Sequence, residues 1–160
     1  MRFFLPDFLA TVPTAMDWAA TPVLIGVVAW LSVIDLREFR LPDSGTLPLI
    51  LAGLGLGAWR VGGLPADHII GALVGYGLFA MIGAVCYRAT GRDALGLGDA
   101  KLLAAAGAWL GWSALPTVVL FAAVTGLVFA ALRAGSTEAI PFGPALGLSI
   151  VLHWSIFLLA

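Results

Sequence analysis

Two aspartates stand where apolar segments of the chain meet charged ones. Asp35 follows directly on the apolar segment 23–34, and Asp99 opens another after Gly96 and Gly98. A single carboxylate at the edge of an apolar segment could be functional, but it could equally cap a helix or reach toward water. Two carboxylates at the same depth can share one proton and divide into a base and an acid. An aspartic protease needs that division, because one carboxylate activates water while its protonated partner polarises the peptide carbonyl.

The neighbours of Asp99 add to this pattern. Gly96 and Gly98 permit backbone conformations that other residues avoid, so we expect the loop to bring its backbone close to a bound peptide. At the start of a helix, Asp99 would be favoured as the ionised member of the pair by the helix dipole. Lys101 could pair with a carboxylate or meet a substrate charge, or it could be an interfacial lysine. Asp43 follows a proline and suits a turn or the N-cap of the next helix, in a supporting role.

The composition restricts where this chemistry can take place. Apolar residues make up 61% of the 160 residues and charged residues 11%, which excludes a soluble enzyme and an intrinsically disordered chain. A net charge of −1 argues against a nucleic-acid partner. The single cysteine, Cys86, can form neither an intrachain disulfide nor a multi-cysteine zinc site. We therefore expect a membrane protein that uses its few polar groups without a metal or cofactor.

Uncharged stretches alternate with charged windows along the chain. The uncharged stretches are 18–34, 44–59, 69–87, 102–132 and 139–160. A membrane-crossing helix needs about 20 apolar residues, so four of these stretches supply about one crossing each. The stretch 102–132 is too long for one, and the glycine and proline in 111–116 predict a turn between two shorter helices. The sequence thus predicts an all-α, polytopic membrane helix bundle of about six transmembrane helices.

Six crossings place all the charged windows on one side of the membrane. The basic residues of that side are Arg37, Arg40, Arg88, Arg92, Lys101 and Arg133. Only Arg2 and Arg60 lie opposite, and loops rich in Lys and Arg stay cytoplasmic, so the windows should face the cytoplasm. The arginines either set this topology alone or also anchor anionic lipid. We expect residues 1–20 to form an N-terminal interfacial segment, without a cleaved signal peptide, and residues 21–160 the membrane-embedded core.

Small residues recur at a spacing of four, which in lipid lets helix backbones approach closely. The pairs are Gly53 and Gly57, Gly71 and Gly75, Gly107 and Gly111, and Gly143 and Gly147. His68 and His153 fall on the side opposite the aspartates, so we expect neither to bind a metal or to act in catalysis. Trp59, Trp112 and Trp154 lie near predicted outer ends, where they suit either the headgroup layer or the core.

Three segments resemble the type IV prepilin peptidases. IDLREFRLPDSGTLPL at 34–49 is similar to the first signature of that family. GLGDAKLLAAAGAWLG at 96–111 resembles the second, the Gly-x-Gly-Asp motif with its following lysine, and IPFGP at 140–144 resembles the third. A lone Gly-x-Gly-Asp would be weak, but three motifs in order on one side of six spans are specific.

This resemblance implies a membrane aspartic endopeptidase that cuts the leader from prepilins or pseudopilins on the cytoplasmic side. Its catalytic aspartates carry over to Asp35 and Asp99, and its supporting positions to Asp43, Gly96, Gly98 and Lys101. The implied location is the bacterial cytoplasmic membrane, with lipid and a prepilin or pseudopilin as partners. The sequence predicts no particular oligomeric state.

The long members of the family carry a cytoplasmic domain with paired Cys-x-x-Cys motifs near the N-terminus and also methylate the new N-terminus. About 20 residues precede the first predicted span here, and none is cysteine. From this departure we expect the short form of the enzyme, with cleavage but neither methyl transfer nor zinc.

Two other function classes fit a membrane bundle with few charges. A small proton-coupled transporter or channel would also use an acidic pair, but its charges are expected near the bilayer midplane, often in repeated halves. Here the charges gather at one boundary. A noncatalytic assembly subunit would have no need of the paired signatures.

Overall fold

The computed structural model describes residues 12–91, 96–132 and 141–159. Within these residues the chain forms six α-helices and one short 3-10 helix, with no strand. The elements are α1 Ala15–Glu38, α2 Asp43–Val61, α3 Ala66–Thr90, α4 Leu97–Leu110, η2 Trp112–Ala114, α5 Leu115–Leu132 and α6 Gly143–Leu159. The predicted all-α architecture with six main helices is confirmed.

The helices end where the sequence supplies residues that interrupt helices. Phe39, Gly62 and Gly91 terminate α1, α2 and α3 in the left-handed conformation, in which a residue can cap a helix by bonding back to its last turn. Pro42 and Pro65, which lack the N–H needed to continue a helix, precede α2 and α3. Connections of this kind are short, so successive helices turn back on each other.

The predicted interruption at 111–116 is also present. Gly111, with a φ of 79°, ends α4, and the 3-10 helix η2 leads into α5. Helix α4 is therefore only 14 residues long. The sequence analysis also divided the chain after residue 20 into an interfacial segment and a membrane-embedded core. Helix α1 begins before this boundary, at Ala15. The division itself remains a prediction.

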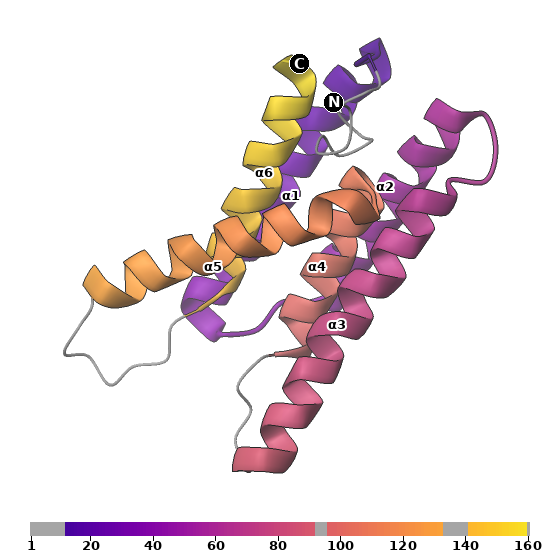
Figure 1. Cartoon of the computed structure of the whole chain (residues 1–160). Helices are drawn as coiled ribbons and strands as arrows, with labels where there is room; N and C mark the ends of the chain where they lie inside the picture. The colour runs from indigo at the N-terminus through magenta and orange to yellow at the C-terminus, as the bar shows by residue number, and fades with distance from the viewer. Residues whose placement is uncertain (1–11, 92–95, 133–140, 160) are drawn as a thin grey trace, which may run out of the picture.

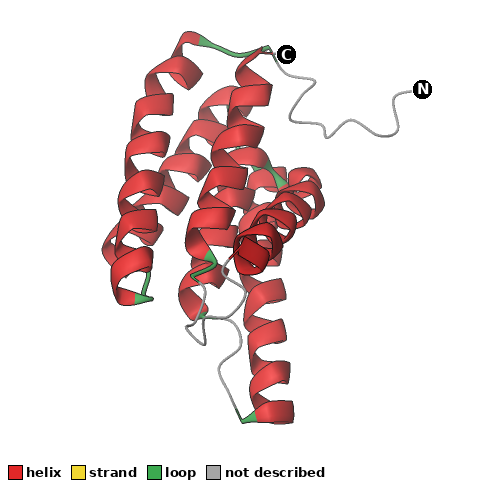
Figure 2. Cartoon of the chain, turned by 90° about the vertical axis from the view of Figure 1, so that its left-hand side faces the viewer, coloured by secondary structure: helices red, strands yellow, loops and turns green. Residues whose placement is uncertain are grey.

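Helix α4 lies at the centre of the bundle and packs against α3, α2 and α6. Helices α1 and α6 run antiparallel, side by side (Figure 1). Helix α5 packs on α6 but lies across its direction, so that it is seen nearly end-on after the quarter turn between Figures 1 and 2. The bundle is thus built around a short, enclosed helix, with one outer helix strongly inclined.

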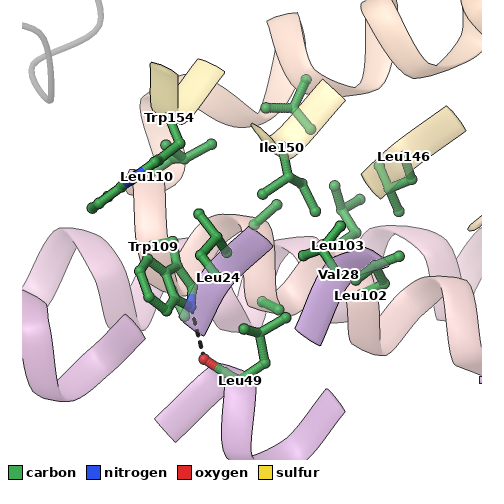
Figure 3. Packing of buried hydrophobic residues seen from close by; sticks show 14 of the residues in the cluster. Leu24, Val28, Leu49, Leu102, Leu103, Trp109, Leu110, Leu146, Ile150 and Trp154 are labelled. Carbon is green, nitrogen blue, oxygen red and sulfur yellow. Dashed lines mark hydrogen bonds between the residues drawn. The ribbon is translucent and has the colours of Figure 1, made fainter. Parts of the chain in front are cut away.

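The core is made mainly by α4, in which Ala100 and every residue from Leu102 to Leu110 are buried. Its small side chains let α3 come so close that a Cβ on Gly107 would overlap the backbone of Gly71, which confirms close packing for this pair of glycines. Trp109 donates a hydrogen bond from Nε1 to the carbonyl oxygen of Leu49 on α2, 2.8 Å away (Figure 3). In lipid, van der Waals contact between closely packed helices stabilises such a bundle more than the hydrophobic effect does.

Three helical segments are long and apolar enough to cross a membrane: Ala15–Glu38, Ala66–Ala89 and Trp112–Leu132. Gly143–Leu159 is a shorter apolar helix. Many large apolar side chains point away from the core, including Leu73 on α3 and Leu127 on α5. Outward apolar surface of this extent suits a lipid environment, so the fold is that of a helical membrane protein.

The polar residues separate to the two ends of the bundle. The C-terminal ends of α1 and α3 and the N-terminal ends of α2, α4 and α6 lie toward one end, and the opposite helix ends lie toward the other (Figure 1). The first end carries Asp35, Asp43, Asp99 and Lys101, and the second carries Arg60 and His68. Arg92 and Arg133, which the topology prediction also used, lie outside the described residues.

Candidate active site

Asp35 lies in the last turn of α1, because the helix continues beyond the apolar segment to Glu38. Phe39 then takes the left-handed conformation, and its N–H bonds to the carbonyl oxygen of Asp35 at 3.0 Å. The helix stops there and the chain turns toward α2. The Asp35 side chain is held inside the bundle, with an exposed fraction of 6%.

Asp99 lies in the first turn of α4, where Gly96 is the N-cap residue. Its backbone N–H bonds to the carbonyl oxygen of Gly96 at 3.1 Å. Its Oδ1 atom is buried and has no hydrogen-bond partner among the described residues. A buried carboxylate oxygen without a partner is costly, and such an atom calls for a functional explanation.

Asp35 and Asp99 line the same cavity. The cavity has a volume of about 590 Å³ and opens at the end of the bundle where α1, α2 and α4 meet. Its lining includes all the site residues proposed from the sequence: Asp35, Asp43, Gly96, Gly98, Asp99 and Lys101. The structure therefore brings together residues that are up to 66 positions apart.

Gly98 is needed for close packing. A Cβ on Gly98 would lie 2.8 Å from the Cβ of Leu41, in the connection between α1 and α2. Gly96 has no such neighbour, and its φ of −72° and ψ of 145° are open to any residue. Neither glycine takes a backbone conformation that other residues avoid, because Gly98 lies within a regular helix and Gly96 is extended. The expected approach of this loop to a bound peptide stays a prediction.

Lys101 and Asp43 form an ion pair at the rim of the cavity. Asp43 is the first residue of α2, whose N-cap residue is Pro42, so the N-cap role suggested for Asp43 is wrong. The reason is that the preceding proline already takes the extended cap conformation, which leaves the Asp43 side chain free to reach across to α4. The pair links two of the helices that form the cavity.

Gly143 is a contact of this site whose role the sequence did not indicate. It is the first residue of α6, and its N–H donates to Oδ2 of Asp35 over 3.0 Å. The third segment of family resemblance includes this glycine, but nothing in the local spacing shows that it meets a residue 108 positions earlier. The cavity also includes Trp30, Glu38 and Phe39, which the sequence analysis did not select.

The two histidines lie at the opposite end of the bundle from the aspartates, as predicted. Nδ1 of His68 is 2.9 Å from the carbonyl oxygen of Ala108, and Nδ1 of His153 is 2.8 Å from that of Ser149. Among the described residues no group of three or more His, Cys, Asp or Glu side chains could hold a metal ion. The charged and hydroxyl side chains that line the cavity are those of Asp35, Glu38, Arg40, Asp43, Ser44, Asp99 and Lys101.

Two carboxylates in one partly enclosed cavity can hold a water molecule between them and exchange protons with it. The cavity lies at the ends of the helices rather than in their middle. This arrangement can perform general acid–base chemistry on an amide bond.

Comparisons with known proteins identify the family of the chain. The model of the type IV leader peptidase family matches residues 22–131, which include both aspartates. The chain is 40% identical over 154 residues to the prepilin leader peptidase/N-methyltransferase of Pectobacterium carotovorum subsp. carotovorum, covering 92% of this chain and 54% of that protein. It is 38% identical over 145 residues to the protein of the same name from Escherichia coli (strain K12), covering 83% of this chain and 64% of the relative.

The chain thus spans about half the length of the first of these relatives. The same holds for the prepilin leader peptidase/N-methyltransferase of Burkholderia pseudomallei (strain K96243), which is 44% identical over 139 residues, covering 84% of this chain and 45% of that protein. No solved structure shows a significant match. The family model covers more than half of the chain, and the chain therefore belongs to the type IV leader peptidase family.

Proposed function

We propose that this protein is an aspartic endopeptidase of the bacterial cytoplasmic membrane that cleaves the leader peptide from prepilins or pseudopilins. The observation that carries the proposal is that Asp35 and Asp99 line one cavity. The membership in the leader peptidase family and the names of the related proteins supply the substrate class.

In the proposed reaction the two aspartates share one proton. The charged member takes a proton from a water molecule, whose oxygen attacks the carbonyl carbon of the scissile peptide bond. The protonated member gives its proton to the carbonyl oxygen. When the tetrahedral intermediate collapses, the carbon–nitrogen bond breaks and the amine leaves with the proton taken from water, while the other proton returns to its carboxylate. The pair is thereby restored for the next turnover.

The supporting residues act on the shape and charge of the cavity. Gly98 lets the connection between α1 and α2 pack against the start of α4, beside Asp99. The ion pair of Lys101 with Asp43 keeps the starts of α2 and α4 together at the rim. Neither residue of this pair exchanges protons with the peptide in the proposed reaction, so both are positioning residues.

The proposal is tested by incubating the purified protein with a panel of prepilins and pseudopilins and identifying the products by mass spectrometry. We expect one cut that separates the leader from the apolar helix of the substrate. If no member of the panel is cut while a full-length relative cuts it under the same conditions, the proposed activity is wrong. Adding S-adenosylmethionine tests methyl transfer in the same assay, since a methylated product would be heavier and would contradict our expectation of cleavage alone.

The proposal also places the cavity on the cytoplasmic side. The support is the distribution of Arg and Lys between the two sides, counted along the sequence. In a Cys86→Ser background, Arg92→Cys should react with an impermeant thiol reagent only from the cytoplasmic side. Gly63→Cys, at an exposed position beyond α2 where a side chain has room, should react only from outside. The opposite result for both would reverse the orientation.

A transporter or channel is not favoured. In the described part of the chain the aspartates lie in a terminal turn of α1 and of α4, away from the middle of the bundle. The related proteins carry the name of a peptidase.

A further inference from the structure

The start of α6 meets the candidate catalytic Asp35 through its backbone alone. The N–H of Gly143 donates to Oδ2 of Asp35 at 3.0 Å, and both residues are buried. Gly143 is the first residue of its helix, so its N–H has no acceptor within the helix and is available for this contact. The hydrogen bond joins the two antiparallel helices α1 and α6 at the site.

Any side chain at position 143 would disturb this contact. A Cβ built on Gly143 would lie 2.5 Å from Oδ2, 3.0 Å from Cγ and 3.3 Å from Cβ of Asp35. All three of these neighbours belong to the aspartate itself, so the strain would fall directly on the proposed catalytic group. By contrast, a Cβ on Gly77 would meet nothing within 4 Å.

The dipoles of the two helices that meet here act in opposite directions on the charge of Asp35. Asp35 lies in the last turn of α1, where the helix dipole disfavours a negative charge. The N-terminus of α6 presents a positive dipole end and a free N–H to the same carboxylate. This arrangement offsets the unfavourable position of Asp35 and leaves its other oxygen, Oδ1, for water and for the shared proton.

We propose that Gly143 is a positioning residue of the peptidase, whose backbone N–H and missing side chain hold Asp35 as the charged, water-activating member of the pair. This inference rests on the proposed function and adds to it which aspartate acts as the base and which as the acid. It assigns the base to Asp35, whereas the helix dipole of α4 alone favoured Asp99 for that role. Asp99 then carries the shared proton, and the burial of its Oδ1 without a partner among the described residues disfavours a charge on this carboxyl group.

The test is Gly143→Ala, compared with Gly147→Ala one turn further along α6. A Cβ on Gly147 would crowd the same helix, at 2.8 Å from Cγ1 of Val28 and 2.9 Å from Oγ of Ser32, but would not touch Asp35. We expect Gly143→Ala to lower kcat by about 100-fold, because a displacement of about 1 Å in a reacting group costs about this much. KM should hardly change, since substrate contacts are kept. Gly147→Ala should retain most of the kcat of the wild type, even where its stability falls.

A thermal unfolding cycle tests the contact independently of activity. In the wild-type background both substitutions should lower the unfolding midpoint in detergent. In an Asp35→Ala background Oδ2 and Cγ are removed and only the contact of 3.3 Å with Cβ remains, so the loss caused by Gly143→Ala should become clearly smaller while the loss caused by Gly147→Ala persists. An equal loss in both backgrounds, or a kcat of Gly143→Ala no lower than that of Gly147→Ala, would overturn the inference.

These outcomes separate the inference from the proposed function. If Asp35→Asn and Asp99→Asn are inactive while Gly143→Ala keeps full kcat, the aspartic mechanism stands and the role of Gly143 is wrong. If Asp35→Asn cleaves as fast as the wild type, the aspartic mechanism of the proposed function fails although cleavage itself stands, and the unfolding cycle then shows only whether Gly143 contacts Asp35.

Discussion

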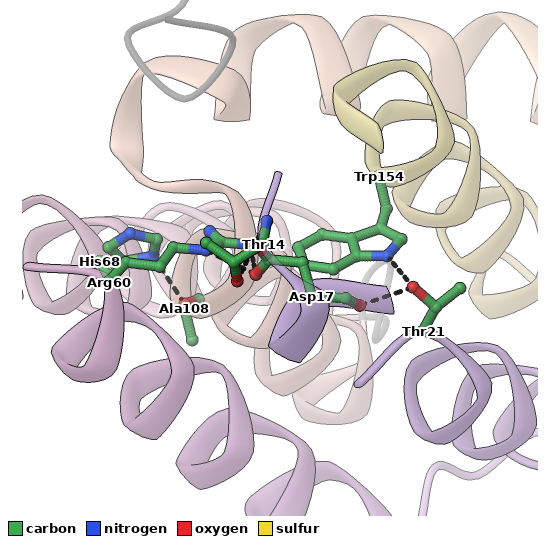
Figure 4. A network of polar contacts seen from close by, with 7 residues as sticks. All are labelled: Thr14, Asp17, Thr21, Arg60, His68, Ala108 and Trp154. Atoms are coloured by element: carbon green, nitrogen blue, oxygen red, sulfur yellow. Dashed lines mark hydrogen bonds and ion pairs between the residues drawn. The ribbon is translucent and has the colours of Figure 1, made fainter. Parts of the chain in front are cut away.

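The bundle buries acidic side chains at both of its ends but provides them with different numbers of hydrogen-bond donors. At the end away from the cavity, Asp17 of α1 is fully buried and accepts hydrogen bonds from Thr14 N at 2.7 Å, Thr14 Oγ1 at 2.8 Å and Arg60 Nε at 2.8 Å (Figure 4). Nη2 of Arg60 adds an ion-pair contact of 2.6 Å. At the cavity end, Asp35 accepts the N–H of Gly143, and Oδ1 of Asp99 has no partner among the described residues.

The partners of Arg60 complete the first of these regions. Its guanidinium lies 5.1 Å from the ring centroid of Trp154 and 4.7 Å from that of Phe157, both on α6. Nε1 of Trp154 in turn donates to Oγ1 of Thr21 on α1 at 2.9 Å. The charge pair is therefore enclosed between α1, α2 and α6 and links all three. A cation enclosed by aromatic faces and a carboxylate has little capacity left for a ligand.

The difference shows how one residue type serves two purposes. Asp17, with donors on both of its oxygens, holds helices together, because any movement would leave a charge buried and unpaired. Asp35 and Asp99 instead line a cavity, and among the described residues fewer donors meet their oxygens than meet those of Asp17. Stability and chemistry are thus assigned to opposite ends of the same helices.

The largest effect on cleavage should come from the cavity end. Asp35→Asn and Asp99→Asn should each abolish cleavage, because an amide keeps the size of the side chain but cannot exchange a proton with water. We expect the cleavage rate to fall by about 100-fold to 10,000-fold. The thermal unfolding midpoint should stay near that of the wild type. The rate is measured by mass spectrometry of the product, with Asp67→Asn, an exposed carboxylate at the other end, as the matched control. Full activity of either variant would remove the aspartic mechanism.

The next largest effect should come from the ion pair of Asp17 with Arg60, and it should be on stability rather than on the rate of cleavage. Asp17→Asn leaves the Arg60 charge enclosed without its partner, and breaking a buried pair in this way costs about 3–5 kcal/mol. We expect a clear fall in the unfolding midpoint in detergent, while the cleavage rate per folded molecule remains close to that of the wild type.

The double variant Asp17→Asn/Arg60→Met sharpens this comparison. Removing both charges avoids the unpaired cation, so part of the lost stability should return. A loss in the double variant equal to the sum of the two single losses would show that the residues do not act as a pair. A loss of cleavage in the folded Asp17→Asn protein would show that the two ends are coupled.

The smallest effect should come from the ion pair at the rim of the cavity. The side chains of Lys101 and Asp43 are 25% and 58% exposed, and an exposed pair contributes about 0–1 kcal/mol. Lys101→Met and Asp43→Asn should therefore each slow cleavage by less than about tenfold, since a tenfold change corresponds to about 1.4 kcal/mol. The measurement is kcat/KM for the same prepilin. A loss in Lys101→Met as large as that in Asp99→Asn would place Lys101 in the chemistry.

Several features of the first region, which contains Asp17 and Arg60, were beyond the sequence analysis. Arg60 was interpreted only as a charge on the outer side, and Asp17 fell in the segment expected at the interface. Trp154, for which the headgroup layer and the core were equally suitable, is fully buried in the core, while Trp59 and Trp112 are exposed. A charge near the end of an apolar segment has no local signal that distinguishes a solvated residue from one enclosed by partners on other helices.

The positions of the helices were determined by the sequence itself. Hydropathy, charge and helix-interrupting residues are local properties, so the uncharged stretches and the turn at 111–116 predicted the six α-helices that the structure contains. The shared end of Asp35 and Asp99 also followed, because the two helices between them, α2 and α3, run in opposite directions and bring the chain back to the same end. The nature of the site was therefore visible from residue types and their order.

Only the tertiary structure decided which groups those aspartates meet. The contact of Asp35 with the N–H of Gly143 depends on the rotation and depth of α6 against α1, over a separation of 108 residues. The burial of Asp17 against Arg60 depends on α1 beginning at Ala15 and on α2 ending beside it. Such contacts arise from the packing of helix faces, which is a property of the whole bundle, and no spacing within one helix specifies the partner on another.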